Sequence, residues 1–204
     1  MNKSGLILLT SCLLILAGSI PVKNGYDIGD KVEDFTLKNV TGEMISLSDY
    51  EDERGVILIF DCNTCPYSQA YRDRIKALHA TFAVKGFPVV AIQPNDAERS
   101  PGDSFDNMQS YAKKHNYKHP YLHDKSQEVT KAFGATNTPH VFLLENEKGD
   151  FIVRYIGAID NNTRDASKAD NKYVEEAIKA LLNGEQPEQT KTKAIGCTIK
   201  WKAS

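Results

Sequence analysis

Hydrophobic residues along this chain fall into patterns that predict alternating strands and helices. Continuous apolar runs at residues 56–60 and 87–92 are typical of strands buried on both faces of a sheet. Between them, apolar residues recur at helical spacing, which predicts an amphipathic helix from residue 66 to about residue 84. The apolar face of this helix consists of Tyr71, Ile75, Leu78 and Phe82. A strand, a helix and a strand in this order predict a right-handed crossover between parallel strands.

Shorter elements are predicted on either side of this unit. Two hairpins are expected, each made of two apolar runs around a turn that contains glycine. Their strands are residues 35–37 with 44–47, and residues 140–144 with 151–156. Helices are expected around residues 105–114 and 127–133, and from residue 173 to a cap at Asn183–Gly184. The polar stretch 94–135 is expected to hold only loops and the first two of these helices.

The N-terminal residues resemble a targeting segment. The apolar run Leu6–Ala17 is short for a membrane span but has the length of the apolar region of a signal peptide. Small residues at Ala17–Ser19 suit a cleavage site, so we expect residues 1–19 to be a signal peptide that exports the chain, to the periplasm. Two alternatives stay open: an uncleaved membrane anchor, or a lipobox that makes Cys12 a lipidated N-terminus.

Length and charge limit the remaining possibilities. With 204 residues, the chain suits one domain. We expect a linker at residues 20–26, a domain at 27–185 and a C-terminal extension at 186–204. The 25 basic and 27 acidic residues nearly balance, so neither a nucleic acid nor an anionic membrane surface is an expected partner. A membrane contact is expected only through an N-terminal anchor or lipid.

Three cysteines remain after residue 19, namely Cys62, Cys65 and Cys197. An odd number of cysteines in an exported protein is a poor disulfide framework and leaves at least one thiol unpaired or reactive. A close pair with one distant cysteine therefore indicates redox or metal chemistry.

The close pair lies where a buried strand gives way to a helix. Proline is favoured at the first helical position, so Pro66 places Cys65 at the N-cap. Free backbone N–H groups and the helix dipole stabilise a thiolate there and lower its pKa. Cys62 can come within disulfide distance of Cys65, and this pair can exchange disulfides without a cofactor or metal. Half of a structural zinc site and a permanent structural disulfide are the alternatives.

These motifs resemble the thioredoxin superfamily, and in particular its peroxiredoxin-like redoxins of AhpC/TSA type, which are related to exported bacterial thiol–disulfide oxidoreductases. The resemblance covers roughly residues 27–185. It rests on Gly29–Leu37 with the following Ile45–Ser48, on Gly134–Pro139 before an apolar strand, and on Tyr155–Ala158. The ending Gly196–Lys202 is also similar to the tail of this group. The resemblance implies an α/β thioredoxin fold with an N-terminal β-hairpin, a helical insertion and a C-terminal tail.

The resemblance also implies roles for individual residues. A cis Thr138–Pro139 peptide bond would face the cysteine pair, and both residues would bind an extended substrate segment. Cys65 falls where a peroxiredoxin has its peroxidatic cysteine, whereas Cys62 replaces the threonine that binds peroxide. This departure favours dithiol exchange over peroxide reduction and leaves open which thiol attacks first, although the helix cap favours Cys65.

Other residues are accessory candidates. Asp61 either assists proton transfer to a buried thiol or takes part in the turn. Cys197 is a third redox thiol, a partner reached by docking of the tail, or an inert buried cysteine. His115, His119 and His123 have no common metal-ligand spacing and are expected on the surface.

The sequence thus predicts a thiol–disulfide oxidoreductase that acts on protein disulfides or dithiols and receives electrons from an upstream reductant. One rival is a peroxiredoxin-type peroxidase. The other is a metallochaperone that binds copper through Cys62, Cys65 and His140. The oligomeric state does not follow from the sequence.

Overall fold

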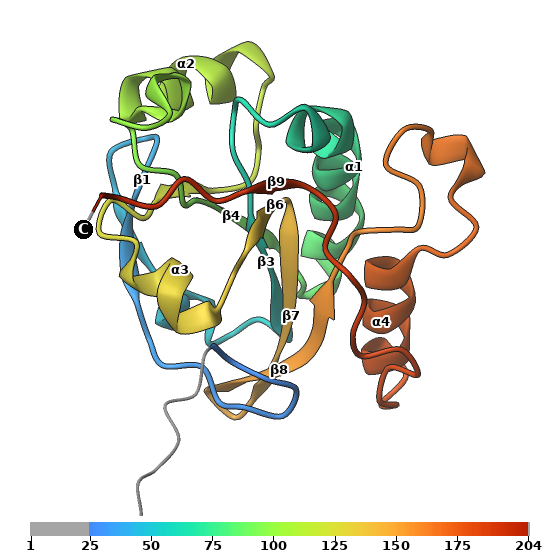
Figure 1. Ribbon diagram of the computed structural model, residues 1–204. Helices are drawn as coiled ribbons and strands as arrows, with labels where there is room; N and C mark the ends of the chain where they lie inside the picture. The colour runs from blue at the N-terminus through green and yellow to red at the C-terminus, as the bar shows by residue number, and fades with distance from the viewer. Residues whose placement is uncertain (1–24, 204) are drawn as a thin grey trace, which may run out of the picture.

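The computed structural model describes residues 25–203, which fold around one seven-stranded mixed sheet (Figure 1). The strand order is β2-β1-β5-β4-β3-β7-β8. The strands are β1 (Thr36–Asn39), β2 (Met44–Ser46), β3 (Gly55–Phe60), β4 (Val89–Gln93), β5 (Tyr121–His123), β7 (His140–Glu147) and β8 (Asp150–Gly157). A second, two-stranded sheet joins β6 (Asn137–Thr138) to β9 (Cys197–Thr198). The helices are α1 (Pro66–Phe82), α2 (Phe105–Lys114), α3 (Glu128–Phe133) and α4 (Tyr173–Leu182).

The central strand β3 is buried on both faces because its side chains alternate between two apolar clusters. Ile57 and Ile59 pack with α1 and α4 on one face. Val56, Leu58 and Phe60 pack on the other face with α3 and the N-terminal hairpin. The parallel pairing of β3 with β4 confirms the predicted crossover through α1. The carboxyl ends of β3 and β4 therefore lie at the same end of the sheet, and the cysteine pair follows β3 there.

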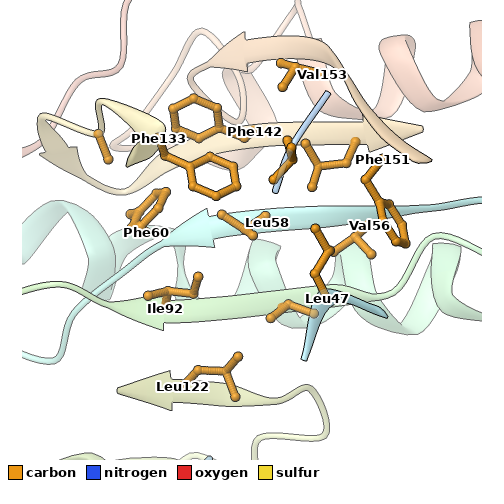
Figure 2. Packing of buried hydrophobic residues seen from close by; sticks show 14 of the residues in the cluster. Leu47, Val56, Leu58, Phe60, Ile92, Leu122, Phe133, Phe142, Phe151 and Val153 are labelled. Atoms are coloured by element: carbon orange, nitrogen blue, oxygen red, sulfur yellow. The ribbon is translucent and has the colours of Figure 1, made fainter. Parts of the chain in front are cut away.

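An aromatic cluster holds this end of β3 in place (Figure 2). The rings of Phe60, Phe133 and Phe142 meet edge to face, with centroid separations of 5.1–5.7 Å. Each of the three side chains is almost completely buried. The cluster therefore fixes α3 and β7 against the strand that leads into the cysteine motif.

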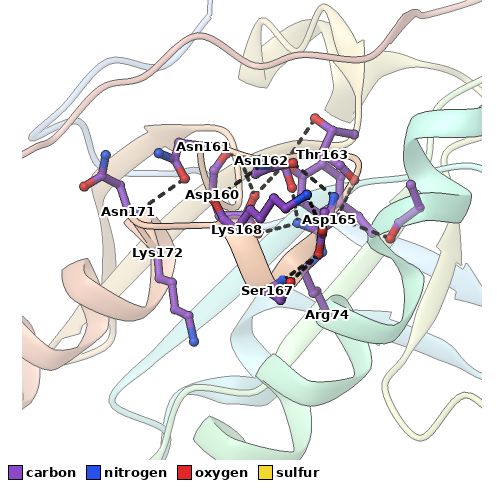
Figure 3. A network of polar contacts seen from close by, with 12 residues as sticks. Arg74, Asp160, Asn161, Asn162, Thr163, Asp165, Ser167, Lys168, Asn171 and Lys172 are labelled. Carbon is purple, nitrogen blue, oxygen red and sulfur yellow. Dashed lines mark hydrogen bonds and ion pairs between the residues drawn. The ribbon is translucent and has the colours of Figure 1, made fainter.

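The loop between β8 and α4 is tied to α1 by a polar network (Figure 3). Arg74 donates to a carboxylate oxygen of Asp160 at 2.6 Å and to the carbonyl oxygens of Asn162 and Thr163, each also at 2.6 Å. Tyr71 donates to the other carboxylate oxygen of Asp160 at 2.9 Å. Because Asp160 is buried and both of its oxygens are paired, the network holds the middle of α1 in a defined position against this loop.

Most of the predicted elements are confirmed, with differences at a few ends. The second buried strand begins at Val89 rather than at residue 87. The polar stretch contains a strand, β5, that was not expected. The expectation that all three histidines lie on the surface is wrong for His119, which is 4% exposed because its ring packs against those of His79 and Tyr117.

The predicted signal peptide, its alternatives and Cys12 lie outside the described residues. Among residues 25–203, no helix has the length and apolar character needed to cross a bilayer.

Candidate active site

The cysteine pair lies at the junction predicted from the sequence, between β3 and α1. Cys65 is the N-cap residue of α1 and has an extended backbone, and Pro66 occupies the first helical turn. Cys62 precedes it in the loop that leaves β3. Cys62, Cys65 and Cys197 are all free thiols.

Thr138, the residue before Pro139, contacts both sulfur atoms. The Thr138–Pro139 peptide bond is cis, as the resemblance implied. The hydroxyl Oγ1 of Thr138 lies 3.2 Å from the Sγ of Cys62. The carbonyl oxygen of Thr138 lies 3.1 Å from the Sγ of Cys65. The structure therefore brings together Cys62, Cys65, Thr138 and Pro139.

The two thiols differ strongly in acidity. A hydrogen bond from the Cys62 thiol is the largest cause that lowers the pKa of Cys65, to about 4, and a bond to the Cys197 thiol and backbone N–H groups contribute further. The same sulfur–sulfur bond raises the pKa of Cys62 far above its ordinary value, and burial adds to this. Cys65 is therefore the more acidic thiol of the pair, and Cys62 is the one that retains its proton more strongly.

Asp61 is a buried carboxyl group beside the pair. It is 2% exposed, and one of its carboxylate oxygens has no hydrogen-bond partner. Burial is the main cause that raises its pKa to about 7. A carboxyl group with this pKa can take up and release a proton near neutral pH.

A second buried carboxylate, Asp103, fixes the loop between the cysteines. One of its oxygens accepts from the backbone N–H groups of Asn63 and Thr64, at 2.8 and 3.1 Å. The other accepts from the side chains of Thr64, Ser100 and Asn95. Sequence reasoning missed Asp103, although the turn at Pro101–Gly102 before it was a local signal.

The other predicted accessory residues have different positions. Cys197 is half-buried, and its backbone N–H donates to the Sγ of Cys65 at 3.4 Å. His140 is buried, and its Nδ1 accepts from the backbone N–H of Thr136 while its ring packs on Phe142. Among residues 25–203, no group of three or more His, Cys, Asp or Glu side chains is arranged to hold a metal ion.

Comparison of the sequence with known proteins finds a matching family model and similar redox proteins. The model of the AhpC/TSA family matches residues 28–161. The thiol-disulfide oxidoreductase ResA of Bacillus cereus is 24% identical over 156 residues, which cover 72% of this chain and 86% of that protein.

Solved structures extend the likeness to most of the chain. A protein from Sinorhizobium meliloti 1021 has a TM-score of 0.81 and 31% identity, and the match covers 89% of this chain and 98% of that one. The thioredoxin domain of a thiol-disulfide oxidoreductase from Bacteroides vulgatus has a TM-score of 0.53 and 15% identity, over 65% of this chain and 91% of that domain. The second likeness identifies the fold as that of thioredoxin.

Proposed function

Because the chain belongs to the AhpC/TSA family, we propose that it is a thiol–disulfide oxidoreductase that exchanges disulfides in exported proteins through Cys62 and Cys65. The observation that supports this most directly is the contrast between the two thiols. Cys65 has a pKa lowered to about 4 at the N-cap of α1, and the Cys62 thiol donates to it. This arrangement supplies one nucleophile and one resolving thiol without any cofactor.

The reaction begins at Cys65. Its thiolate attacks one sulfur of a substrate disulfide, so a bond from Cys65 to the substrate forms and the second substrate sulfur leaves as a thiolate. The Sγ of Cys62 then attacks the Sγ of Cys65, which releases the first substrate sulfur and leaves a Cys62–Cys65 disulfide. The substrate gains two electrons, and an upstream dithiol partner returns two electrons to the protein.

Cys62 must lose its proton before it can attack, and its raised pKa makes this costly. Asp61 is the closest candidate base in the sequence, and its charge is among the influences that raise the pKa of Cys62. With a pKa raised to about 7, the Asp61 carboxylate can accept that proton as the mixed disulfide forms and pass it to the departing substrate thiolate. Thr138 and Pro139 would bind the substrate backbone beside the sulfurs.

The proposed setting is outside the cytoplasm. It is supported by the apolar run Leu6–Ala17 and the small residues that follow it. The N-terminal residue of the protein after expression with its leader, read by mass spectrometry, tests this. A new N-terminus near Ser19 supports cleavage, a lipidated Cys12 supports the lipobox, and an intact leader supports an anchor.

Peroxide reduction is the second candidate. Cys65 is only 2% exposed, and a small peroxide reaches such a sulfur more easily than a protein disulfide does. In that reaction the O–O bond breaks, Cys65 becomes a sulfenic acid, and condensation with the Cys62 thiol gives the same disulfide and water.

One assay separates the two candidates. The reduced protein is mixed with insulin or with hydrogen peroxide, and the formation of the Cys62–Cys65 disulfide is followed by alkylation and mass spectrometry. We expect rapid insulin reduction, its loss in Cys65→Ser, and a persistent mixed disulfide with insulin when both Cys62 and Cys197 are changed to serine. Oxidation much faster with peroxide than with insulin contradicts the proposal in favour of a peroxidase. Thiols that remain free with both oxidants contradict either candidate.

A further inference from the structure

The C-terminal tail, defined here as residues 194–202, brings a third sulfur to the reactive pair. β9 pairs antiparallel with β6, and the register places Cys197 opposite Thr138. The Cys197 backbone N–H donates to the Sγ of Cys65 at 3.4 Å, and the Cys197 thiol is among the groups that lower the pKa of Cys65. Cys65 therefore has two thiol neighbours, one before it in the motif and one from the tail.

The tail is held in this place by contacts beyond β9. The Lys200 backbone N–H donates to the side chain of Asn95 at 2.9 Å, and its carbonyl oxygen accepts from the backbone N–H of Asp96 at 2.8 Å. The Lys202 backbone N–H donates to the side chain of Gln127 at 2.8 Å. Such pairing on both sides of the chain shows that the tail has a defined seat on the domain. In Figure 1 the tail, in red, runs along β6 to the end of the chain marked C.

Gly196 fixes how closely the tail approaches β6. A Cβ at this position would lie 2.1 Å from the carbonyl oxygen of Thr138, a distance that no side chain can occupy. The carbonyl oxygen of Gly196 also accepts from the side chain of Asn137 at 2.9 Å. The residue before Cys197 thus lets the tail come close enough for Cys197 to reach Cys65.

The three sulfurs differ in their access to solvent. Cys62 and Cys65 are each 2% exposed, whereas Cys197 is half-buried. Because β9 already pairs with β6, an extended polypeptide cannot pair with that edge while the tail is seated. While the tail is seated, the most exposed of the three sulfurs is therefore that of Cys197, and a protein substrate reaches Cys65 and the edge of β6 only when the tail lifts.

We propose that Cys197 is a third redox cysteine. Its sulfur displaces Cys62 from the Cys62–Cys65 disulfide, and the resulting Cys65–Cys197 disulfide is the one that an external dithiol protein reduces. The inference rests on the proposed function, because the Cys62–Cys65 disulfide must form first. It assigns to the tail the exchange of electrons with the upstream reductant.

The internal step needs no oxidant or reductant. The Cys197 thiolate attacks the Sγ of Cys65 in the Cys62–Cys65 disulfide. The Cys65–Cys197 bond forms as the Cys62–Cys65 bond breaks, and Cys62 leaves as a thiolate that takes up the proton released by Cys197. One disulfide is exchanged for another, so the protein neither gains nor loses electrons.

The return step uses the acidity of Cys65. A thiolate of the external dithiol attacks the exposed Sγ of Cys197, and Cys65 leaves as a thiolate. Low thiol pKa makes a good leaving group, and the pKa of Cys65 is lowered to about 4. The second thiol of the partner then attacks the partner's first sulfur in the mixed disulfide. This step releases Cys197, which takes up a proton. The partner ends as a disulfide, and its two electrons have reduced the protein.

The first test asks whether the predicted disulfide forms. Cys62→Ser, in a Cys12→Ser background, is oxidised with oxidised glutathione and mapped by peptide mass spectrometry. We expect a disulfide that joins the peptides of Cys65 and Cys197. The matched control Cys62→Ser with Cys197→Ser should stop at a mixed disulfide of Cys65 with glutathione. A persistent glutathione adduct on Cys65 in the single variant as well would overturn the inference.

The second test asks whether electrons enter through Cys197. Oxidised wild-type protein and oxidised Cys197→Ser are each reduced with reduced thioredoxin and with a small phosphine. We expect the substitution to slow reduction by thioredoxin by about tenfold or more, because only buried sulfurs remain. Reduction by the phosphine should change much less, since a small reagent does not need the exposed sulfur. Equal slowing with both reductants, or no slowing with either, contradicts the entry of electrons at Cys197.

Failure of the inference is distinguishable from failure of the proposed function. If oxidised Cys197→Ser contains the Cys62–Cys65 disulfide but Cys62→Ser never joins Cys65 to Cys197, only the role of the tail is wrong. If Cys62 and Cys65 do not form a disulfide in any variant, the proposed function itself is wrong.

Discussion

Removal of the Cys62 thiol should make Cys65 a weaker acid. The Cys62 thiol is the largest cause that lowers the pKa of Cys65 to about 4. A hydrogen bond to a charged group contributes about 1.5–3 kcal/mol, and one pKa unit corresponds to about 1.36 kcal/mol. Cys62→Ala should therefore raise the pKa of Cys65 by about one to two units. Cys62→Ser keeps a donor at the same position and should raise it by less.

The ultraviolet absorbance of the thiolate measures this pKa without a reagent that must reach a buried sulfur. A Cys12→Ser background removes the thiol that lies outside the described residues. The pKa of Cys62 is raised well above its ordinary value, and burial raises that of Cys197 to about 11, so only Cys65 ionises in the acidic range. An unchanged midpoint in Cys62→Ala, or an equal shift in both variants, would refute the assignment of Cys62 as the donor.

Three further changes test the surroundings of the pair. Gly196→Ala should lift β9 from β6, because its Cβ would lie 2.1 Å from a backbone oxygen, and so speed the alkylation of Cys65 by iodoacetamide, whereas Ile195→Ala, at an exposed side chain, should not. Burial raises the pKa of Asp61 from 3.8 to about 7, so the folded state holds a proton that the unfolded state has lost, and stability falls as pH rises through that window. Between about pH 4 and pH 7, the free energy of unfolding of the wild type, measured in urea, should fall by up to about 4 kcal/mol relative to that of Asp61→Asn. Parallel pH profiles of the two proteins would exclude a raised pKa for Asp61. Phe133→Ala should cost about 3–5 kcal/mol of unfolding free energy in the same assay, and a loss below about 1 kcal/mol would contradict the packing in Figure 2.

The sequence predicted those parts of the fold that depend on local periodicity. The helical spacing of Tyr71 to Phe82 and the apolar run of β3 each determine an element without help from distant residues. Pro66 likewise predicted the N-cap at Cys65, because the missing N–H group of proline is a local property. The acidity expected for Cys65 followed from that position.

Parts that depend on distant residues could not be predicted in this way. β5 has only three residues, and it is a strand because β1 and β4 pair with it on either side. β9 has two residues, too few for any alternating pattern, and it forms only where Gly196 permits contact with β6. In the sequence, Asp103 cannot be distinguished from a surface turn residue, because its contact with the loop between the cysteines joins segments that are far apart in the chain.

The position of Cys62 connects these observations to the choice between the two candidate reactions. Its sulfur lies 3.2 Å from the hydroxyl of Thr138 and donates to Cys65. A threonine here, as the resemblance to peroxiredoxins implies for that group, could donate in the same way and keep Cys65 acidic. A hydroxyl group cannot, however, form a disulfide, so Cys62 adds a resolving step to an otherwise similar site. With Cys197 as a second thiol beside Cys65, the arrangement suits the transfer of electrons between disulfides better than a single oxidation by peroxide.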